Sequence, residues 1–342
     1  MRLLIATDAW QPLVNGVVRS IEHMIEHAPA QGAETVLISP QDFRSVPLPT
    51  YSEIRLALVP PGDTARRVRA LAPTHIHIAT EGPIGFCVRR LCLKHGFPYT
   101  TSYHTRFPEY VSARVPIPAE WVYRIVRRFH NTGCGVMVAT DSLEAELRER
   151  GFAHIMRWGR GVDTRLYRPR ERSVLDVAGP VFLYVGRVAV EKNLEAFLAL
   201  DLPGTKVVVG DGPAREELTR KYPAVRFLGV KTGEALAEIY ASADVFVFPS
   251  LTDTFGMVLL EALASGLPIA AYPVTGPLDV LGDSGCGVLD ADLRKAALGA
   301  LEIPRERCRA YGERFSWAES AREFFDNVRR AQAGPIDLSR LG

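Results

Sequence analysis

The chain has 342 residues, of which 47% are hydrophobic and 23% are charged, a composition typical of soluble globular proteins of about two domains. A net charge of only +2 argues against a nucleic-acid-binding protein. The five cysteines include no Cys-x-x-Cys pair, which argues against a disulfide framework or structural zinc and fits a reduced, cytoplasmic protein. No apolar run is long enough to span a membrane or to act as a signal peptide.

Short apolar runs alternate with helical patterns through the first half of the chain. Strands are predicted at 3–6, 35–39, 75–79, 99–103, 135–139 and 155–158, and helices at 17–27 and 88–94. Such alternation predicts a parallel sheet with helices on both faces. We therefore expect a first domain over residues 1–165.

A linker pattern follows at 159–170, where two glycines, a proline and four arginines gather. The alternation then restarts and predicts a second domain over 166–315. Its strands are predicted at 181–185, 206–209, 225–228 and 244–248, and its helices at 194–200, 214–221, 235–241 and 257–264. A last amphipathic helix is predicted at 316–333 and places five apolar residues on one face, namely Trp317, Ala321, Phe324, Phe325 and Val328. The fold class is thus α/β, with two doubly wound domains facing a cleft that binds ligands at the carboxyl ends of the strands.

Several well-known motifs are absent from the sequence. It contains no G-x-G-x-x-G, no G-x-x-x-x-G-K-[ST], no H-E-x-x-H and no G-x-S-x-G, so dehydrogenases, P-loop enzymes, zinc proteases and α/β-hydrolases are not favoured. Asp290 and Asp292 resemble the D-x-D of metal-dependent sugar transferases. We expect Asp292 instead to cap a helix at 293–301, because a carboxylate there satisfies the first amides. No metal site is predicted.

The most informative segment runs from 248 to 268. A strand ends at Phe248, a polar loop with Asp253 follows, and Gly256 begins a helix. A helix start presents amides and partial positive charge, which suit a diphosphate, and glycine permits close approach. Glu261, about two turns along, can accept hydrogen bonds from vicinal hydroxyls such as those of a ribose. The alternative is a capped helix with a solvated Glu261.

A second segment follows the strand at 181–185. Gly186 ends this strand, and Arg187 and Lys192 come next, at its carboxyl end. Two cations there can clamp a diphosphate and stabilise it as a leaving group. The alternative is a pair of surface cations beside Glu191.

Three further loops carry weaker signals. The 7–20 segment leads into a helix near Gly16, and its amides can face a phosphate. The strand at 206–209 runs into a glycine-rich turn at Gly210. His104 follows another strand, on the polar loop 101–108. Each of these also has a purely structural interpretation.

Together these segments, in this order, resemble family 4 of the retaining glycosyltransferases, which have the GT-B fold. The resemblance covers nearly the whole chain. The Thr-Asp-Thr-Phe-Gly version at 252–256 is similar to that of a branch containing bacterial diacylglycerol glucosyl and glucuronosyl, sulfoquinovosyl and mannosyl transferases. The helix at 316–333 resembles the family's terminal helix, which crosses back to the first domain.

The resemblance implies a role for each matching residue. Arg187 and Lys192 would bind the donor diphosphate, and Glu261 the ribose. Asp253 replaces the family's first glutamate, which touches sugar hydroxyls, and is one methylene shorter. His104 matches the sugar-contacting histidine, so the catalytic candidates are His104, Asp253, Arg187 and Lys192. The other donor-binding candidates are Asn15, Gly16, Gly186, Gly210, Val230 near the base, Thr254, and the amides of Phe255, Gly256, Met257 and Val258.

Basic residues in the first domain are interpreted as an acceptor or membrane surface. The clusters are Arg66, Arg67 and Arg69, then Arg89, Arg90 and Lys94, and then Arg124, Arg127 and Arg128 beside Trp121. Cations beside aromatics suit an anionic membrane, although each cluster also fits a solvated helix face. Since 99–110 and Trp10 look like bacterial diacylglycerol glycosyltransferases, the acceptor candidates are Asp8, Trp10, Tyr103, Arg124, Arg127 and Arg128.

The resulting expectation is a retaining, metal-independent transferase. It would move a hexose or hexuronic acid from a nucleoside diphosphate sugar, with a UDP-sugar favoured, to diacylglycerol on the inner face of the cytoplasmic membrane. No cofactor besides this co-substrate, and no protein partner, is expected. Three alternatives stay open: a soluble or polysaccharide acceptor with a GDP-mannose or UDP-sugar donor, a nucleotide-sugar epimerase, and a non-catalytic nucleotide-sugar-binding protein.

Overall fold

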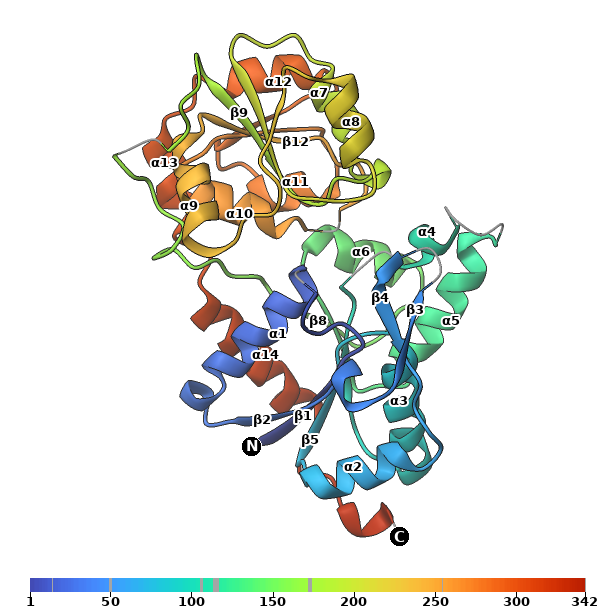
Figure 1. Cartoon of the computed structure of the whole chain (residues 1–342). Helices are drawn as coiled ribbons and strands as arrows, with labels where there is room; N and C mark the ends of the chain where they lie inside the picture. Colours follow the sequence, from blue (N-terminus) through green and yellow to red (C-terminus); the bar gives the residue numbers. More distant parts are fainter. Residues whose placement is uncertain are drawn as a thin grey trace. The chain divides into compact units, whose positions relative to one another are not determined.

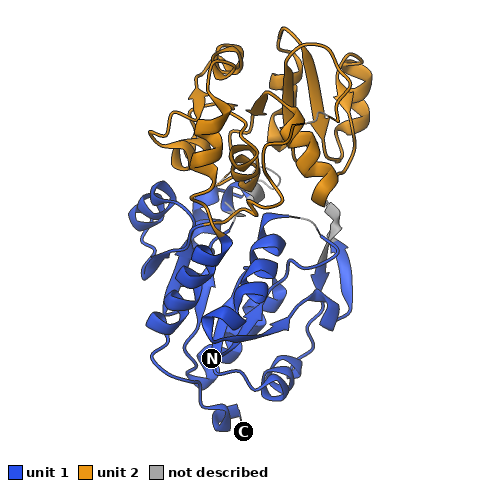
Figure 2. Cartoon of the chain, turned by 90° about the vertical axis from the view of Figure 1, so that its left-hand side faces the viewer, with its two compact units in different colours: residues 1–159, 317–342 blue, residues 160–316 orange. Residues whose placement is uncertain are grey.

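The computed structural model describes residues 1–13, 15–48, 51–104, 107–112, 117–171, 174–253 and 255–341. The chain forms two compact units, one of Met1–Gly159 with Trp317–Gly342 and one of Arg160–Ser316 (Figure 2). The first unit ends at Gly159, before the expected boundary at 165. The reason is that Val162 already pairs with Ser316 and donates its N–H to the Phe315 carbonyl at 3.1 Å, so both connecting segments join the second unit here.

The first unit contains a six-stranded, fully parallel sheet in the order β2-β1-β5-β6-β7-β8. The strands are β1 (Arg2–Ala6), β2 (Glu34–Ile38), β5 (His75–Ile78), β6 (Thr100–Ser102), β7 (Gly135–Val138) and β8 (Ile155–Arg157). Its helices are α1 (Gly16–His27), α2 (Asp63–Leu71), α3 (Pro83–His95), α4 (Phe107–Ser112), α5 (Ala119–Asn131) and α6 (Asp141–Glu149). The antiparallel hairpin of β3 (Ser45–Leu48) and β4 (Tyr51–Ala57) was not predicted, since Pro47 lies within its first strand.

The second unit repeats this architecture, with strand order β11-β10-β9-β12-β13-β14. The strands are β9 (Val181–Val185), β10 (Thr205–Val209), β11 (Arg226–Phe227), β12 (Val245–Phe248), β13 (Ile269–Ala271) and β14 (Gly287–Leu289). The helices are α7 (Leu194–Leu198), α8 (Arg215–Lys221), α9 (Gly233–Ser242), α10 (Met257–Ala264), α11 (Thr275–Leu281), α12 (Leu293–Ala300) and α13 (Arg305–Gly312). Two doubly wound α/β units confirm the predicted fold class.

Alternation along β9 explains why its run is apolar throughout. Leu183 faces a core that contains Leu236 of α9 and Leu259 of α10. Phe182 faces the opposite core, which contains Phe197 of α7. Both faces of β9 are covered by helices, so every position of this strand is buried and hydrophobic.

Helix α14 (Trp317–Ala331) belongs to the first unit, and all five residues of its predicted apolar face are buried. It lies beside α1 (Figure 1). The Trp158 indole N–H donates to the Ser320 hydroxyl at 3.1 Å, and the Glu323 carboxylate accepts from the Gly159 N–H at 2.6 Å. These bonds fix the start of α14 to the end of the first sheet.

Candidate active site

In the second unit, the loops after β9 and β10 are in direct backbone contact. The Gly186 N–H donates to the Val209 carbonyl at 3.0 Å. A Cβ on Gly210 would lie 1.9 Å from the Gly186 carbonyl oxygen, and one on Gly212 would lie 2.3 Å from that of Val188. Since no side chain fits in either space, Gly210 has a packing role in addition to its predicted place in the donor site.

Lys192 and Asp253 form an ion pair between the loop after β9 and the loop after β12. Lys192 ends the 3₁₀ turn Val190–Lys192, and Asp253 lies in the loop after β12. The neighbouring Asn193 amide donates to the Pro249 carbonyl at 3.1 Å and ties the same two loops together. Two residues predicted from separate motifs are therefore in direct contact.

Arg187 follows Gly186 at the carboxyl end of β9 and precedes Lys192 on the same side of the strand's end in the sequence. Its carbonyl accepts a hydrogen bond from the Tyr184 hydroxyl at 2.9 Å, which fixes the backbone at the base of its side chain. Burial, followed by the charges of Asp253 and Glu191, raises the pKa of Tyr184, so this hydroxyl stays a donor. Tyr184 was not predicted as a site residue, because its position in an apolar strand gives only a core signal.

Helix α10 begins at Met257, with Gly256 as its N-cap in the left-handed region at φ 79°. Among the described residues no side chain caps this helix, and its first turn contains no acidic residue. By contrast, side chains cap α1 and α12. The start of α10 carries the partial positive charge of a helix N-terminus, as an anion site requires. The predicted site residue Thr254 lies outside the described residues.

Glu261 is only 4% exposed, so the alternative of a solvated carboxylate is wrong. Its Oε2 accepts a hydrogen bond of 2.9 Å from the hydroxyl of Tyr240, which lies on α9 and is fully buried. Tyr240 was not predicted as a site residue, because an aromatic residue on the apolar face of a helix indicates only core packing.

Val230 follows β11 and is 61% exposed. The preceding Gly229 carbonyl accepts from the Gly210 N–H at 2.8 Å, so the structure brings the predicted base-binding turn and the glycine-rich turn together.

In the first unit, Asn15 caps α1. Its side-chain oxygen accepts from the amides of Val17 and Val18, both at 3.0 Å. The expectation that this helix start offers its amides to a phosphate is therefore wrong for these two N–H groups, since the chain's own cap satisfies them. Gly16, the first residue of the helix, is exposed.

Asp8, a predicted acceptor residue, joins β1 to the start of α3. Its carboxylate accepts from the N–H groups of Ile84 at 2.8 Å and Gly85 at 3.2 Å and from the Thr80 hydroxyl at 3.0 Å. Burial raises the pKa of the Asp8 carboxyl, while these hydrogen bonds oppose the rise. A Cβ on Gly82 would lie 2.3 Å from its Cγ. This geometry supports a structural role for Asp8, which anchors the start of α3 to the end of β1.

Trp10, another acceptor candidate, is half-buried.

Tyr103 and His104 follow β6 directly. Tyr103 is 1% exposed, and its ring packs against those of His130 and Phe152, with centroids 5.7 and 6.0 Å away. Tyr103 is thus a core residue rather than part of an open acceptor surface. His104 is half-buried and contacts the Trp158 ring edge-on at 5.6 Å.

The predicted basic cluster of Arg124, Arg127 and Arg128 lies on α5, and its members have different surroundings. Val122 and Val126 face the core, whereas Trp121 and Ile125 are both 61% exposed. Arg124 and Arg128 are exposed beside them, and the Arg124 guanidinium lies 5.3 Å from the Trp121 ring centre. Arg127 instead donates to the Arg150 carbonyl at 2.7 Å and closes the end of α6, so its predicted membrane role is not supported.

Helix α3 extends this exposed surface. Phe86 contacts Phe129 of α5 at 4.9 Å, and Arg89 donates to the Arg128 carbonyl at 3.2 Å. We define the α3–α5 face as the exposed residues Phe86, Arg90, Leu93, Lys94, Trp121, Arg124, Ile125 and Arg128. In the described part of the chain, no acidic side chain pairs with its four cations.

The remaining basic cluster has other partners. Arg67 pairs with Asp42 and Asp63, Arg66 pairs with Asp63, and Arg69 donates to the Leu341 carbonyl at 3.0 Å. Arg67 and Arg69 tie α2 to Asp42 and Leu341, so the expectation that these two arginines contact a membrane is not supported, whereas Arg66 pairs within the helix and its side chain is exposed.

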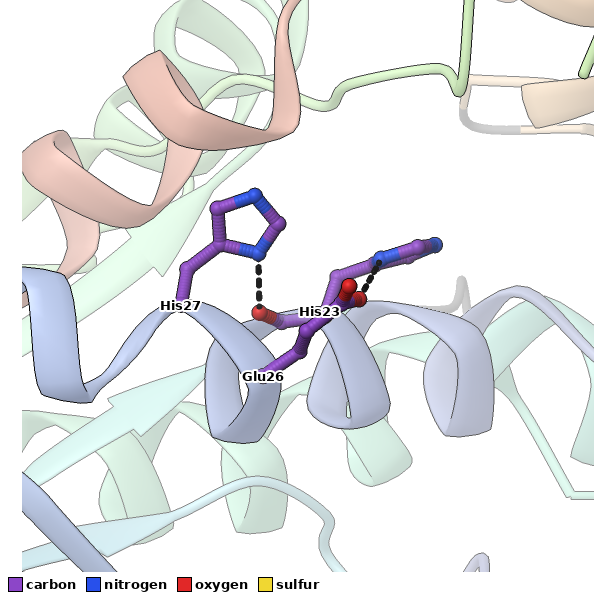
Figure 3. Close-up of side chains that lie close together, drawn as sticks. All are labelled: His23, Glu26 and His27. Carbon is purple, nitrogen blue, oxygen red and sulfur yellow. Dashed lines mark hydrogen bonds and ion pairs between the residues drawn. The ribbon is translucent and has the colours of Figure 1, made fainter. Parts of the chain in front are cut away.

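His23, Glu26 and His27 of α1 place possible metal-ligating atoms within 4.8 Å of one another. Nδ1 of His23 lies 3.0 Å from the Glu26 carboxylate, and Nδ1 of His27 lies 3.0 Å from the His23 carbonyl oxygen (Figure 3). The other ring nitrogens point in different directions in Figure 3. The Nδ1 atoms of both histidines already contact groups of α1 itself. This geometry therefore favours a cluster of side chains on the helix surface over a metal site.

Asp292 caps α12, as predicted, by accepting from the amides of Arg294 at 2.9 Å and Lys295 at 3.2 Å. The D-x-D segment is therefore explained by helix capping.

Comparison with known proteins finds two family matches. The family described as Glycosyltransferase Family 4 matches residues 14–166, and the family described as Glycosyl transferases group 1 matches residues 179–302. The chain is 30% identical over 315 residues to a GDP-mannose-dependent alpha-mannosyltransferase of Mycobacterium tuberculosis, covering 84% of this chain and 83% of the relative. It is 24% identical over 346 residues to an alpha-monoglucosyldiacylglycerol synthase of Streptococcus pneumoniae, covering 88% and 78%.

The sucrose-phosphate synthase of Thermosynechococcus elongatus has a similar structure, with a TM-score of 0.80 and 21% identity, covering 97% of this chain and 99% of that one. This similarity confirms the GT-B fold. The match to the mannosyltransferase over 84% of this chain, joined with the two family matches, makes this chain a member of glycosyltransferase family 4 and hence an enzyme that uses nucleotide sugars.

Proposed function

We propose that the protein transfers a sugar, with retention at the anomeric carbon and without a metal, from a nucleoside diphosphate sugar to a membrane lipid. The observation that carries this proposal is the ion pair of Lys192, in the loop after β9, with Asp253, in the loop that precedes α10. It combines a cation for the departing diphosphate with a carboxylate for the sugar hydroxyls.

The main barrier to such a transfer is the negative charge that develops on the departing diphosphate. Lys192, Arg187 and the positive end of α10 would stabilise this charge as the bond to the sugar breaks. Because a pre-positioned cation needs no reorganisation during the reaction, the hold of Asp253 on Lys192 contributes to catalysis. The departing phosphate would accept the proton of the attacking hydroxyl on the same face of the sugar.

The α3–α5 face supports a lipid acceptor. It combines four exposed apolar side chains with four cations, the pattern of an interfacial surface on an anionic bilayer. No helix in the described residues is long and apolar enough to cross a membrane. Similarity to a glucosyldiacylglycerol synthase supports diacylglycerol as the acceptor to test first.

The donor is the least constrained part of the proposal. The sequence-based expectation is a UDP-sugar, whereas similarity to a GDP-mannose-dependent enzyme favours GDP-mannose. We propose GDP-mannose as the first donor to test, with UDP-glucose and UDP-glucuronic acid as the next.

The test is nucleoside diphosphate release from these donors in EDTA, with and without diacylglycerol in anionic vesicles. Lipid-dependent release from one donor, with an α-linked product, would support the proposal and identify the sugar. Release without lipid but with a soluble acceptor would replace the lipid part. Loss of release in EDTA would overturn the metal-independent part.

A further inference from the structure

We propose that Tyr240 is a positioning residue that orients Glu261 toward the ribose of the donor nucleotide. This inference rests on the proposed function, since it concerns the same donor site. It is carried by one hydrogen bond between two buried side chains on adjacent helices, α9 and α10.

A buried carboxylate is costly unless hydrogen bonds replace its lost hydration. The Tyr240 hydroxyl donates to Glu261 Oε2 at 2.9 Å. Because Tyr240 is fully buried and Glu261 is 4% exposed, water competes little for this bond. The bond therefore restricts rotation of the carboxylate plane.

The ring of Tyr240 is itself held on two sides. It meets the Tyr167 ring edge-on, with centroids 5.6 Å apart, and the Phe246 ring at 5.8 Å. Phe246 belongs to β12, the strand that leads into the loop with Asp253. The core of the second unit thus holds the Tyr240 hydroxyl in place. The hydroxyl in turn positions the Glu261 carboxylate relative to the donor site.

A carboxylate binds two vicinal hydroxyls well only when its plane is aligned with them, because each oxygen must meet one donor. Packing alone would be satisfied equally by phenylalanine at 240. The hydroxyl adds a specific contact to Glu261 Oε2, and we assign to it the alignment of Glu261 with the ribose.

The decisive variant is Tyr240→Phe, which keeps the ring and removes the bond. Calorimetry would compare GDP and UDP with their 2′-deoxy counterparts in wild type and variant. We expect the Kd of the ribonucleotide that the enzyme prefers to rise about fivefold, the energy of one modest hydrogen bond, and that of the deoxy form to stay within about twofold. In turnover, KM for the donor should rise while kcat changes little.

Two controls separate positioning from loss of packing. Tyr311→Phe removes another hydroxyl of the same unit, one that donates to the Val280 carbonyl at 2.9 Å, and should leave ribose discrimination unchanged. In a Glu261→Ala background, Tyr240→Phe should have no further effect on nucleotide binding.

Equal weakening of ribo- and deoxynucleotide binding by Tyr240→Phe, or no weakening, would overturn the inference. Failure of the donor part of the proposed function would look different, since the wild-type protein would then bind no nucleoside diphosphate at all. Failure of the lipid part would leave this binding test unchanged.

Discussion

The ammonium of Lys192 is paired with the carboxylate of Asp253, 61 residues away in the sequence. Their strands explain this meeting. β9, which precedes Lys192, pairs directly with β12, which precedes Asp253, and both are parallel. The loops at their carboxyl ends therefore lie together, at the edge where α/β sheets bind ligands.

Replacing Asp253 by alanine should lower kcat at least tenfold, because the sugar loses a carboxylate and Lys192 loses its fixed position. Product release under saturating donor measures this. The melting temperature of the variant, compared with wild type, is the control for folding. A loss below tenfold in a folded variant would remove Asp253 from the site.

Reversing charge on the α3–α5 face should weaken membrane binding. Arg124→Glu combined with Arg128→Glu should reduce co-sedimentation with anionic vesicles at low salt at least tenfold, because each cation contributes about 1 kcal/mol at such a surface. The double variant Arg220→Glu and Arg226→Glu changes two exposed arginines of the second unit and is the matched control. Equal loss in both variants would indicate general electrostatics, and no loss in either would contradict the membrane surface.

Asp8→Ala should destabilise the first unit by about 1–3 kcal/mol, since two buried amides of α3 and the Thr80 hydroxyl lose their acceptor. Denaturant unfolding measures this change. If Asp8 were chiefly an acceptor ligand, the variant would keep wild-type stability and lose only affinity for the acceptor.

The cysteines should differ sharply in reactivity. Burial raises the pKa of Cys308 to about 12, and that of Cys92 also rises, whereas Cys134 is exposed. The thiolate is the reactive form, so a raised pKa slows labelling at any pH below it. Ellman's reagent at pH 8 should label Cys134 first in the native protein, and Cys134→Ser should abolish this phase. Rapid labelling of the buried thiols would contradict the described packing.

Much of the fold could be predicted because its signals are local. The apolar runs of β9 and β12, the five-residue face of α14 and the Asp292 cap depend on neighbours within one or two turns of chain. Periodicity and capping chemistry record such short-range interactions directly. The order of the motifs likewise indicates the family, because it is a property of the sequence alone.

Only the tertiary structure decided which side chains share partners. It joined Lys192 to Asp253 and Tyr240 to Glu261. It also showed that Asn15 and Arg127 form hydrogen bonds at helix ends, although the sequence predicted that they contact ligands. The physical reason is that a side chain's partners depend on which strands pair and which helices cross. The same residue type looks alike in sequence whether a ligand, a helix end or another side chain finally satisfies it.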